Sequence, residues 1–295
     1  MLRVVVAALV CIVLGAVSGQ AQNPAPQNPG PQPEVRSNIA YGSDPAQHLD
    51  LCIPPAWAPP GRPAVVMIHG GYWTVGDKGA YAWQCKLAAD EGIVAAAIDY
   101  RLATGDPHHY WPAQAVDAQL AVRWLRSHAA EFGIAPDHIC ALGDSAGGQI
   151  VLYLAAVGHT VPGDDAGELP GVSSRIACAV DNFGPTDLSS PTMWPPDQLL
   201  FGSDGKTRPT DAEQAASPFF LIKPAMPPVM IAHGRDDKSV KFEQSTQLVA
   251  ALKRDHDPVK MTVFDGGHEF EGLTPQQTVG IVQSELDFIK HPRGQ

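Results

Sequence analysis

Three polar side chains suited to nucleophilic catalysis each follow an apolar stretch of this chain, and the first of them is a serine. Ser145 lies between Gly143 and Gly147, directly after the apolar run 139–142. A serine hydroxyl is a poor nucleophile at neutral pH, so it needs a histidine to accept its proton and an acid to orient that histidine. A serine between glycines, on a tight turn from a strand to a helix, is the arrangement that presents such a nucleophile. Ser145 is therefore the candidate nucleophile.

A candidate acid and a candidate base come later, each in a loop after another apolar run. Asp236 and Asp237 follow the run 229–232, and His268 follows the run 259–264 after a pair of glycines. The order serine, acid, histidine is typical of hydrolases with an open α/β sheet, whose sites form at the carboxyl ends of the strands. We assign His268 as the base and Asp237 as the acid, although Asp236 adjoins it and only one of the two side chains can reach the histidine.

Attack on a carbonyl also creates an oxyanion, which needs hydrogen-bond donors. Removing one such donor costs about 3 kcal/mol of transition-state stabilisation. One donor is expected to be the backbone amide of Ala146, the residue after the nucleophile. The others are expected in the segment 69–73, His-Gly-Gly-Tyr-Trp, which follows another apolar run. Its glycines allow the backbone to approach a substrate closely.

The elements that must position these groups alternate along the chain between strands and helices. This alternation predicts an α/β fold with a mainly parallel sheet and helices on both faces. Residues 185–227 interrupt it with eight prolines, and we favour a small partial lid there over plain surface packing. The predicted strands are 48–53, 64–69, 93–100, 139–142, 176–182, 229–232 and 259–264, and the predicted helices are 80–90, 113–130, 146–156, 241–254 and 274–289.

The first residues have the pattern of an export signal. Arg3 precedes the almost wholly apolar run 4–17, and small residues follow, which predicts a secretory signal peptide over residues 1–21. The apolar run is too short to span a bilayer comfortably, so we expect a secreted or periplasmic protein with no stable membrane insertion after cleavage. Residues 22–33 are rich in proline and glutamine and predict a disordered spacer. The remaining 34–295 form the predicted catalytic domain.

Charge and cysteine content exclude some classes of function. The chain of 295 residues has 20 basic and 31 acidic residues, a net charge of −11, which argues against nucleic-acid binding. Removal of the signal peptide would remove Cys11 and leave four cysteines, with no CxxC pair or Cys/His cluster to suggest a metal site. Cys140 and Cys178 lie in apolar strand runs and are predicted to be buried thiols. Cys52 and Cys85 are the one pair that we consider for a disulfide, and their pairing stays open.

Together, these motifs resemble those of a known group of enzymes. The chain is similar to the α/β-hydrolases of the hormone-sensitive-lipase-like esterase group, close to the BD-FAE (feruloyl esterase-like) family, over about residues 62–290. It departs from many members directly after His-Gly-Gly, because Tyr72 stands where they have a third glycine. The matching motifs are His-Gly-Gly at 69–71, Asp-Tyr-Arg-Leu-Ala at 99–103, Pro-Ala at 112–113 with Val-Asp at 116–117, Gly-Asp-Ser-Ala-Gly-Gly at 143–148, His-Gly-x-x-Asp-x-x-Val at 233–240 and Gly-His at 267–268.

The resemblance implies an α/β-hydrolase fold with an eight-stranded sheet, a small-molecule ester substrate and two-step acyl transfer without cofactor or metal. It selects Asp237 over Asp236 as the acid, because Asp237 occupies the motif position. We also expect Trp73 and Asp144 to contact the substrate. The implied site residues are Ser145, Asp237 and His268 as the catalytic triad, with the amides of Gly71, Tyr72 and Ala146 as oxyanion donors and Gly70 shaping their loop.

Three hypotheses for the function follow. The first is an exported serine carboxylesterase that hydrolyses small or aromatic acyl esters through an acyl-enzyme. The second is an arylformamidase-like amide hydrolase, because His-Gly-Gly-Tyr-Trp at 69–73 also resembles the arylformamidases; the signal peptide counts against it. The third is a binding protein that keeps the hydrolase fold without catalysis, and the presence of all three triad residue types counts against that.

Overall fold

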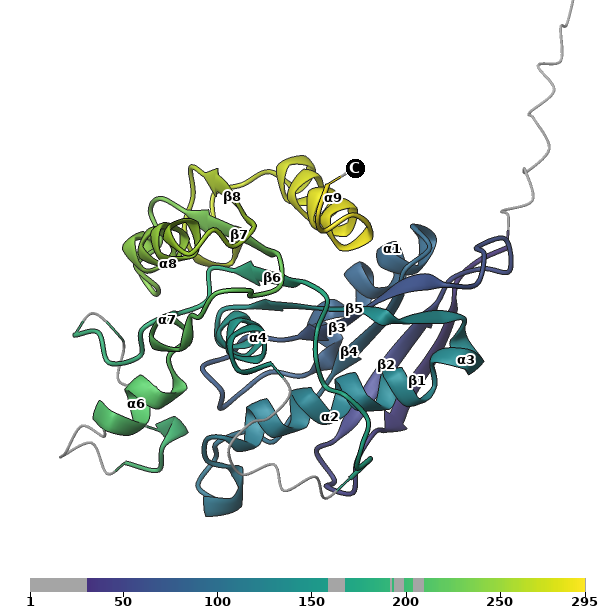
Figure 1. Cartoon of the computed structure of the whole chain (residues 1–295), viewed down its shortest axis with the longest axis horizontal. Helices are drawn as coiled ribbons and strands as arrows, with labels where there is room; N and C mark the ends of the chain where they lie inside the picture. The colour runs from purple at the N-terminus through teal and green to yellow at the C-terminus, as the bar shows by residue number, and fades with distance from the viewer. Residues whose placement is uncertain (1–30, 159–167, 192, 194–198, 204–209, 295) are drawn as a thin grey trace, which may run out of the picture. The chain divides into compact units, whose positions relative to one another are not determined.

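A single sheet forms the centre of the folded chain (Figure 1). The computed structural model describes residues 31–158, 168–191, 193, 199–203 and 210–294, so the predicted signal peptide and most of the predicted spacer lie outside the described residues. Neighbouring strands run in the order β1-β2-β4-β3-β5-β6-β7-β8. The pairs β1–β2 and β2–β4 are antiparallel and all the others are parallel, which confirms the predicted mainly parallel, eight-stranded sheet. The strands are β1 (Glu34–Ala40), β2 (His48–Ile53), β3 (Arg62–Ile68), β4 (Val94–Ile98), β5 (Ile134–Asp144), β6 (Ala179–Asn182), β7 (Val229–Gly234) and β8 (Val259–Phe264).

The central strands β3, β4 and β5 each contain a continuous apolar run because both faces of the sheet are covered. Successive side chains of a strand point to opposite faces, so β3 contributes Val66 and Ile68 to one core and Val65 and Met67 to the other. All four side chains are fully buried. Continuous apolar runs are typical of parallel strands that are buried on both faces.

Helices α1 and α9 cover one face of the sheet, and α2, α4 and α8 cover the other (Figure 1). The start of α9 is fixed by a capping box, in which the side chains of Thr274 and Gln277 each accept the other's backbone N–H. Among the described residues, no helix is both long and apolar enough to cross a membrane. The helices are α1 (Ala82–Asp90), α2 (Ala113–Ser127), α3 (Ala129–Phe132), α4 (Ala146–Val157), α6 (Thr210–Ala216), α7 (Pro218–Leu221), α8 (Phe242–Arg254) and α9 (Pro275–Lys290), with short 3₁₀ turns η1 (Lys78–Tyr81), η2 (Pro107–His109) and η3 (His268–Phe270).

The described part of the proline-rich segment 185–227 packs against the helical layer beside α4. The backbone N–H of Phe219 donates to the carbonyl of Thr186 at 3.0 Å, and the side-chain amide of Gln149 on α4 donates to the carbonyl of Ala216 at 2.8 Å. Leu200 is fully buried. Residues 192, 194–198 and 204–209 lie outside the described residues, so a lid over the site stays a prediction.

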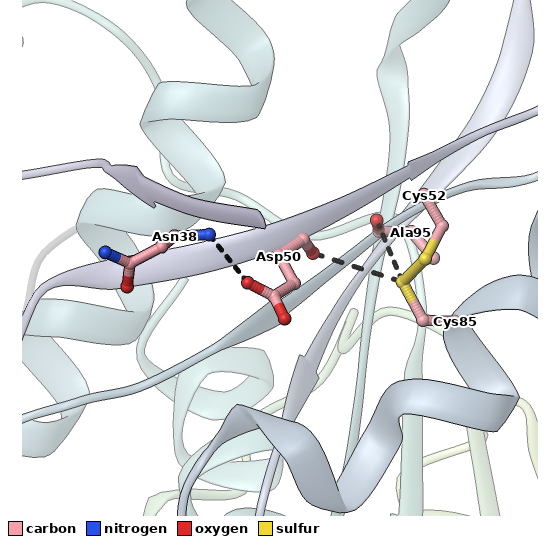
Figure 2. Close-up of a disulfide and its surroundings, with 5 residues drawn as sticks. All are labelled: Asn38, Asp50, Cys52, Cys85 and Ala95. Atoms are coloured by element: carbon pink, nitrogen blue, oxygen red, sulfur yellow. Dashed lines mark hydrogen bonds between the residues drawn. A yellow bond between two sulfur atoms is a disulfide. The ribbon is translucent and has the colours of Figure 1, made fainter. Parts of the chain in front are cut away.

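Two disulfide bonds connect elements around the central strands. Cys52 on β2 is bonded to Cys85 on α1, which answers the question that the sequence left open (Figure 2). The sulfur of Cys85 also lies 3.6 Å from the carbonyl oxygen of Ala95; a disulfide sulfur carries no proton, so this is a packing contact. The prediction of free thiols at Cys140 and Cys178 is wrong, because these two are bonded to each other.

The register of two neighbouring strands explains the second disulfide. Ala141 of β5 pairs with Ala179 of β6, so the residues that precede them, Cys140 and Cys178, also lie side by side. Their Cα atoms are 4.7 Å apart, a separation that a disulfide can span. They are 38 residues apart in the chain, and burial in apolar runs gave no indication that they face each other.

We expect each disulfide to stabilise the fold, mainly by restricting the unfolded chain. The disulfides join residues that are 33 and 38 positions apart in the chain. For loops of this length, the chain-entropy model gives a stabilisation of about 4 kcal/mol per disulfide, as an upper estimate. The double variant Cys140→Ala/Cys178→Ala should therefore lose about 2–4 kcal/mol in free energy of unfolding, measured by urea denaturation. Cys52→Ala/Cys85→Ala is the matched control for loop length. Peptide mapping of the unreduced wild type that found Cys140 and Cys178 as free thiols would contradict the pairing.

Candidate active site

The turn between β5 and α4 holds Ser145 in a conformation that few residues adopt. Its φ is 51° and its ψ is −118°, a strained combination for a residue with a side chain. The backbone N–H of Ser145 donates to the carbonyl of Asn182 at 2.8 Å. A Cβ atom at Gly147 would collide with the carbonyl oxygen of Ile68, so glycine is required where α4 approaches β3. The tight turn predicted from the sequence is therefore held by close packing on both sides.

His268 lies beside this serine. Its Nε2 atom is 3.0 Å from the Oγ of Ser145, although the two residues are 123 positions apart. His268 begins η3, in the loop that follows β8, and its ring packs against Phe183 with 4.8 Å between ring centroids. The backbone N–H of Asp236 donates to the carbonyl of Gly266 at 2.9 Å, which joins the loop after β7 to the loop that carries His268.

Asp237 completes the hydrogen-bonded chain from the other side of the imidazole. Its Oδ2 is 2.7 Å from Nδ1 of His268, and its Oδ1 accepts the backbone N–H groups of Ser239 and Val240 at 2.8 and 2.9 Å. Burial opposes ionisation of this carboxyl, but hydrogen bonds from His233 and His268 outweigh it and hold the pKa of Asp237 well below its usual range. Asp237 is therefore a carboxylate at neutral pH, suited to orient an imidazole and stabilise its protonated form.

The loop after β3 places its backbone next to Ser145. The amide of Gly70 donates to Oδ2 of Asp144 at 3.2 Å, so Gly70 shapes the loop and its own N–H is occupied. Positive φ angles occur at three consecutive residues, Gly71, Tyr72 and Trp73. The backbone of the loop therefore turns tightly at this point. Within the part of the chain that the structure describes, the backbone N–H groups of Gly71, Tyr72 and Ala146 have no hydrogen-bond acceptor. These three amides are thus available to a bound oxyanion.

Trp73 lines a small pocket beside Ser145 and is also part of the core. The pocket has a volume of about 20 Å³, roughly the space that one water molecule needs. Only 2% of Trp73 is exposed, and its indole N–H donates to the side-chain oxygen of Gln149 at 2.9 Å. Tyr72, in contrast, is 41% exposed at the pocket. The pocket is lined by Tyr72, Trp73, Ser145, Ala146, Pro185, Met193, Ser239 and Val240.

Asp144 does not line this pocket, in contrast to the substrate contact that the sequence suggested. Its Oδ1 accepts the hydroxyl of Tyr81 at 2.7 Å, and its Oδ2 accepts the amide of Gly70. Burial raises the pKa of Asp144, although both hydrogen bonds favour the ionised form. The physical reason for the difference is that consecutive side chains at the end of β5 point to opposite sides, so Asp144 supports the loop of Gly70 from behind.

A second cavity, of about 260 Å³, lies on that side of the sheet, between α1 and α9. Asp144 and Tyr81 line it together with Glu285 of α9 and Asn182 of β6. Burial raises the pKa of Glu285 to about 7, although a hydrogen bond from Asn182 opposes the rise. No periodicity in the sequence marked Glu285, because an acidic residue in an amphipathic helix is usually solvent-exposed.

The buried Glu285 predicts a pH-dependent stability. Its pKa is about 7 in the folded chain and about 4.3 in an unfolded chain, so the folded state binds the extra proton between these values. Stability should fall as pH rises from about 4.3 to 7, by about 4 kcal/mol at most. Glu285→Gln should therefore stabilise the protein by about 1–3 kcal/mol at pH 8 and change little at pH 4. Urea denaturation at both pH values, with the exposed Glu243→Gln as control, checks this; an equal effect at both would contradict it.

The described residues contain no cluster of three or more His, Cys, Asp or Glu side chains that could hold a metal ion. The arrangement instead brings together a serine hydroxyl, an imidazole and a carboxylate in one hydrogen-bonded chain, with three available amides nearby. Such a chain can activate a hydroxyl for attack on a carbonyl and stabilise the tetrahedral intermediate. In the sequence, His233 was recognised only as the first residue of the motif at 233–240. Its contact with Asp237 is visible only in the structure.

Comparison with known proteins gives consistent matches. The BD-FAE family model matches residues 49–252. The chain is 30% identical to the probable carboxylic ester hydrolase LipM of Mycobacterium tuberculosis over 74% of this chain and 51% of that protein, and 29% identical to the esterase LipQ of the same organism over 90% and 65%. It therefore spans about half to two thirds of these relatives. Among solved structures, esterase 2 of Thermogutta terrifontis is 28% identical, with a TM-score of 0.71, over 90% of this chain and 96% of that one.

Proposed function

Because the chain belongs to the BD-FAE family and has the α/β-hydrolase fold, we propose that it is an exported serine carboxylesterase that hydrolyses small or aromatic acyl esters. The observation that carries the proposal is the hydrogen-bonded chain from Ser145 through His268 to Asp237. Relatives of similar sequence bear the names of carboxylic ester hydrolases. Export is proposed from the apolar N-terminal segment 4–17.

The proposed mechanism is two-step acyl transfer. The Oγ of Ser145 attacks the ester carbonyl while Nε2 of His268, 3.0 Å away, accepts the hydroxyl proton. Asp237 stabilises the resulting imidazolium, and the amides of Gly71, Tyr72 and Ala146 donate to the oxyanion. The intermediate collapses as His268 returns the proton to the departing alcohol. Water, activated by the same histidine, then hydrolyses the acyl-enzyme and releases the acid.

The small volume beside Ser145 supports a short acyl group. A pocket of about 20 Å³ accommodates little more than a methyl group without rearrangement. Structures of the Thermogutta terrifontis enzyme have been obtained with butyrate and with propionate bound, both short acids. An aromatic acyl group would have to extend past Tyr72, which is 41% exposed at the pocket.

A panel of substrates tests the proposal. We expect the wild type to hydrolyse p-nitrophenyl acetate with a kcat/KM at least tenfold above that for the octanoate, since the longer chain does not fit the pocket. Methyl ferulate and N-formylkynurenine complete the panel. A kcat/KM for N-formylkynurenine well above that for every ester would replace the esterase with an arylformamidase-like amide hydrolase. Absence of turnover on the whole panel, together with no labelling of Ser145 by paraoxon, would instead favour the non-catalytic binding protein.

A further inference from the structure

A second histidine lies behind the carboxylate that orients His268. His233 belongs to β7 and is fully buried, with 0% of its surface exposed. Its ring packs edge-on against Phe242, with 5.6 Å between ring centroids. Its Nδ1 is 2.6 Å from the hydroxyl oxygen of Ser245 on α8. The imidazole is therefore fixed at one end by a helix and cannot rotate freely.

The other end of the ring points at two acceptors. Nε2 of His233 lies 3.0 Å from the carbonyl oxygen of Val240 and 3.2 Å from Oδ2 of Asp237. Neither oxygen can donate a hydrogen bond, so Nε2 must carry the proton. The N–H group donates to both oxygens, and its geometry is better toward the carbonyl of Val240. Nδ1 can then accept the hydroxyl proton of Ser245. One neutral imidazole thus satisfies all of these contacts.

This contact completes a set of donors around the carboxylate of Asp237. Oδ2 faces His268 at 2.7 Å and His233 at 3.2 Å, while Oδ1 receives the backbone amides of Ser239 and Val240. His233 also holds the carbonyl of Val240, so it braces the same turn that supplies those amides. A carboxylate that is hydrogen-bonded on both oxygens is held in one orientation. The hydrogen bond between Nδ1 of His268 and Oδ2 of Asp237 then fixes the orientation of the imidazole.

We propose that His233 is a positioning residue of the acyl-transfer reaction, which acts by fixing the Asp237 carboxylate and the turn 237–240 against β7 and α8. The inference rests on the proposed function of Ser145. His233 touches neither the candidate nucleophile nor the pocket beside it. Its N–H is needed for rate rather than for substrate binding, because a carboxylate that turns away leaves the imidazole free to adopt unproductive orientations.

Two variants of His233 separate hydrogen bonding from packing. His233→Gln keeps an N–H group near the position of Nε2, and His233→Leu removes it while keeping an apolar side chain. We expect His233→Leu to lower kcat for p-nitrophenyl acetate by about 10- to 100-fold with KM within about twofold, since misplacement of catalytic groups has effects of this size. His233→Gln should retain at least about a third of the wild-type kcat.

His138→Leu is the matched control. His138 is a partly buried histidine whose Nε2 also bonds a backbone carbonyl, that of Ile289 at 2.7 Å. It lies near the start of β5, away from the site, so its loss should lower stability and leave kcat within about twofold of the wild type. A folded His233→Leu with wild-type kcat would overturn the inference. So would a His233→Gln variant as slow as His233→Leu, because packing would then explain the loss. If His233→Leu does not fold, His233→Gln decides: a kcat below about a third of the wild-type value, or loss in Ser145→Ala/His233→Gln of the resonance described next, then contradicts the inference.

A proton NMR measurement tests the inference without any substrate. The proton between Nδ1 of His268 and Oδ2 of Asp237 should give a low-field resonance in Ser145→Ala, and Ser145→Ala/His233→Gln should preserve it. The resonance should shift or broaden in Ser145→Ala/His233→Leu. An unchanged resonance there, in a wild type that hydrolyses esters, contradicts the role of His233 and leaves the esterase proposal intact. A wild type without esterase activity refutes the proposed function, while the resonance still reports on the carboxylate.

Discussion

Replacing Ser145 with alanine should abolish ester hydrolysis while the fold stays intact. The Oγ of this residue is the only atom removed, and it is the atom 3.0 Å from Nε2 of His268. Loss of the nucleophile of a serine hydrolase lowers kcat by about 10³- to 10⁶-fold, because the residual rate comes from binding and the oxyanion donors alone. The backbone strain at φ 51° is the same for alanine and serine, so stability should change little.

The measurement is the hydrolysis of p-nitrophenyl acetate by matched preparations, with Ser127→Ala on the exposed side of α2 as the control. Among the described residues, Ser127 bonds only within its own helix region, and its variant should retain wild-type activity. Mass spectrometry after treatment with paraoxon should find the wild type modified at Ser145 and the alanine variant unmodified; the Thermogutta terrifontis enzyme has been solved in a form phosphorylated by paraoxon. Equal rates for wild type and Ser145→Ala would exclude Ser145 as the nucleophile.

Replacing Asp237 with asparagine should have the second-largest effect. An amide in this position cannot stabilise an imidazolium, and its NH₂ group favours the wrong tautomer of His268, so kcat should fall by about 10³- to 10⁴-fold. Asp236→Asn is a closely matched control, because it changes the neighbouring residue by the same atoms. Asp236 is solvent-exposed, and its variant should keep kcat within about twofold. Comparable losses in both variants would contradict the assignment of the acid.

The low pKa of Asp237 has a consequence for stability at acid pH. The pKa of Asp237 is held well below its usual range by hydrogen bonds from His233 and His268, against the effect of burial. Its carboxylate therefore stays ionised across the neutral pH range. A depressed acid pKa also means that this carboxylate contributes stability above about pH 4, lost as pH falls through the lower folded value.

The amino-acid sequence alone determined the elements and the order of the candidate site. An apolar run that ends in a glycine-rich turn is a local feature, so Ser145, Asp237 and His268 could each be assigned to a loop after a strand. Parallel strands bring their carboxyl ends to one edge of a sheet, which is why residues assigned singly meet within hydrogen-bond distance. The same reasoning located the loop 69–73 and its amides.

The tertiary structure alone decided which distant residues face each other. The register of β5 and β6 joined Cys140 to Cys178, where burial had suggested two thiols. The side chain of Asp144, at the end of β5, accepts hydrogen bonds from Tyr81 and Gly70 and does not line the pocket beside Ser145. The packing of β7 against α8 set His233 behind Asp237. Strand register, side-chain direction and helix packing arise from contacts across the whole core, and no local pattern of residues contains them.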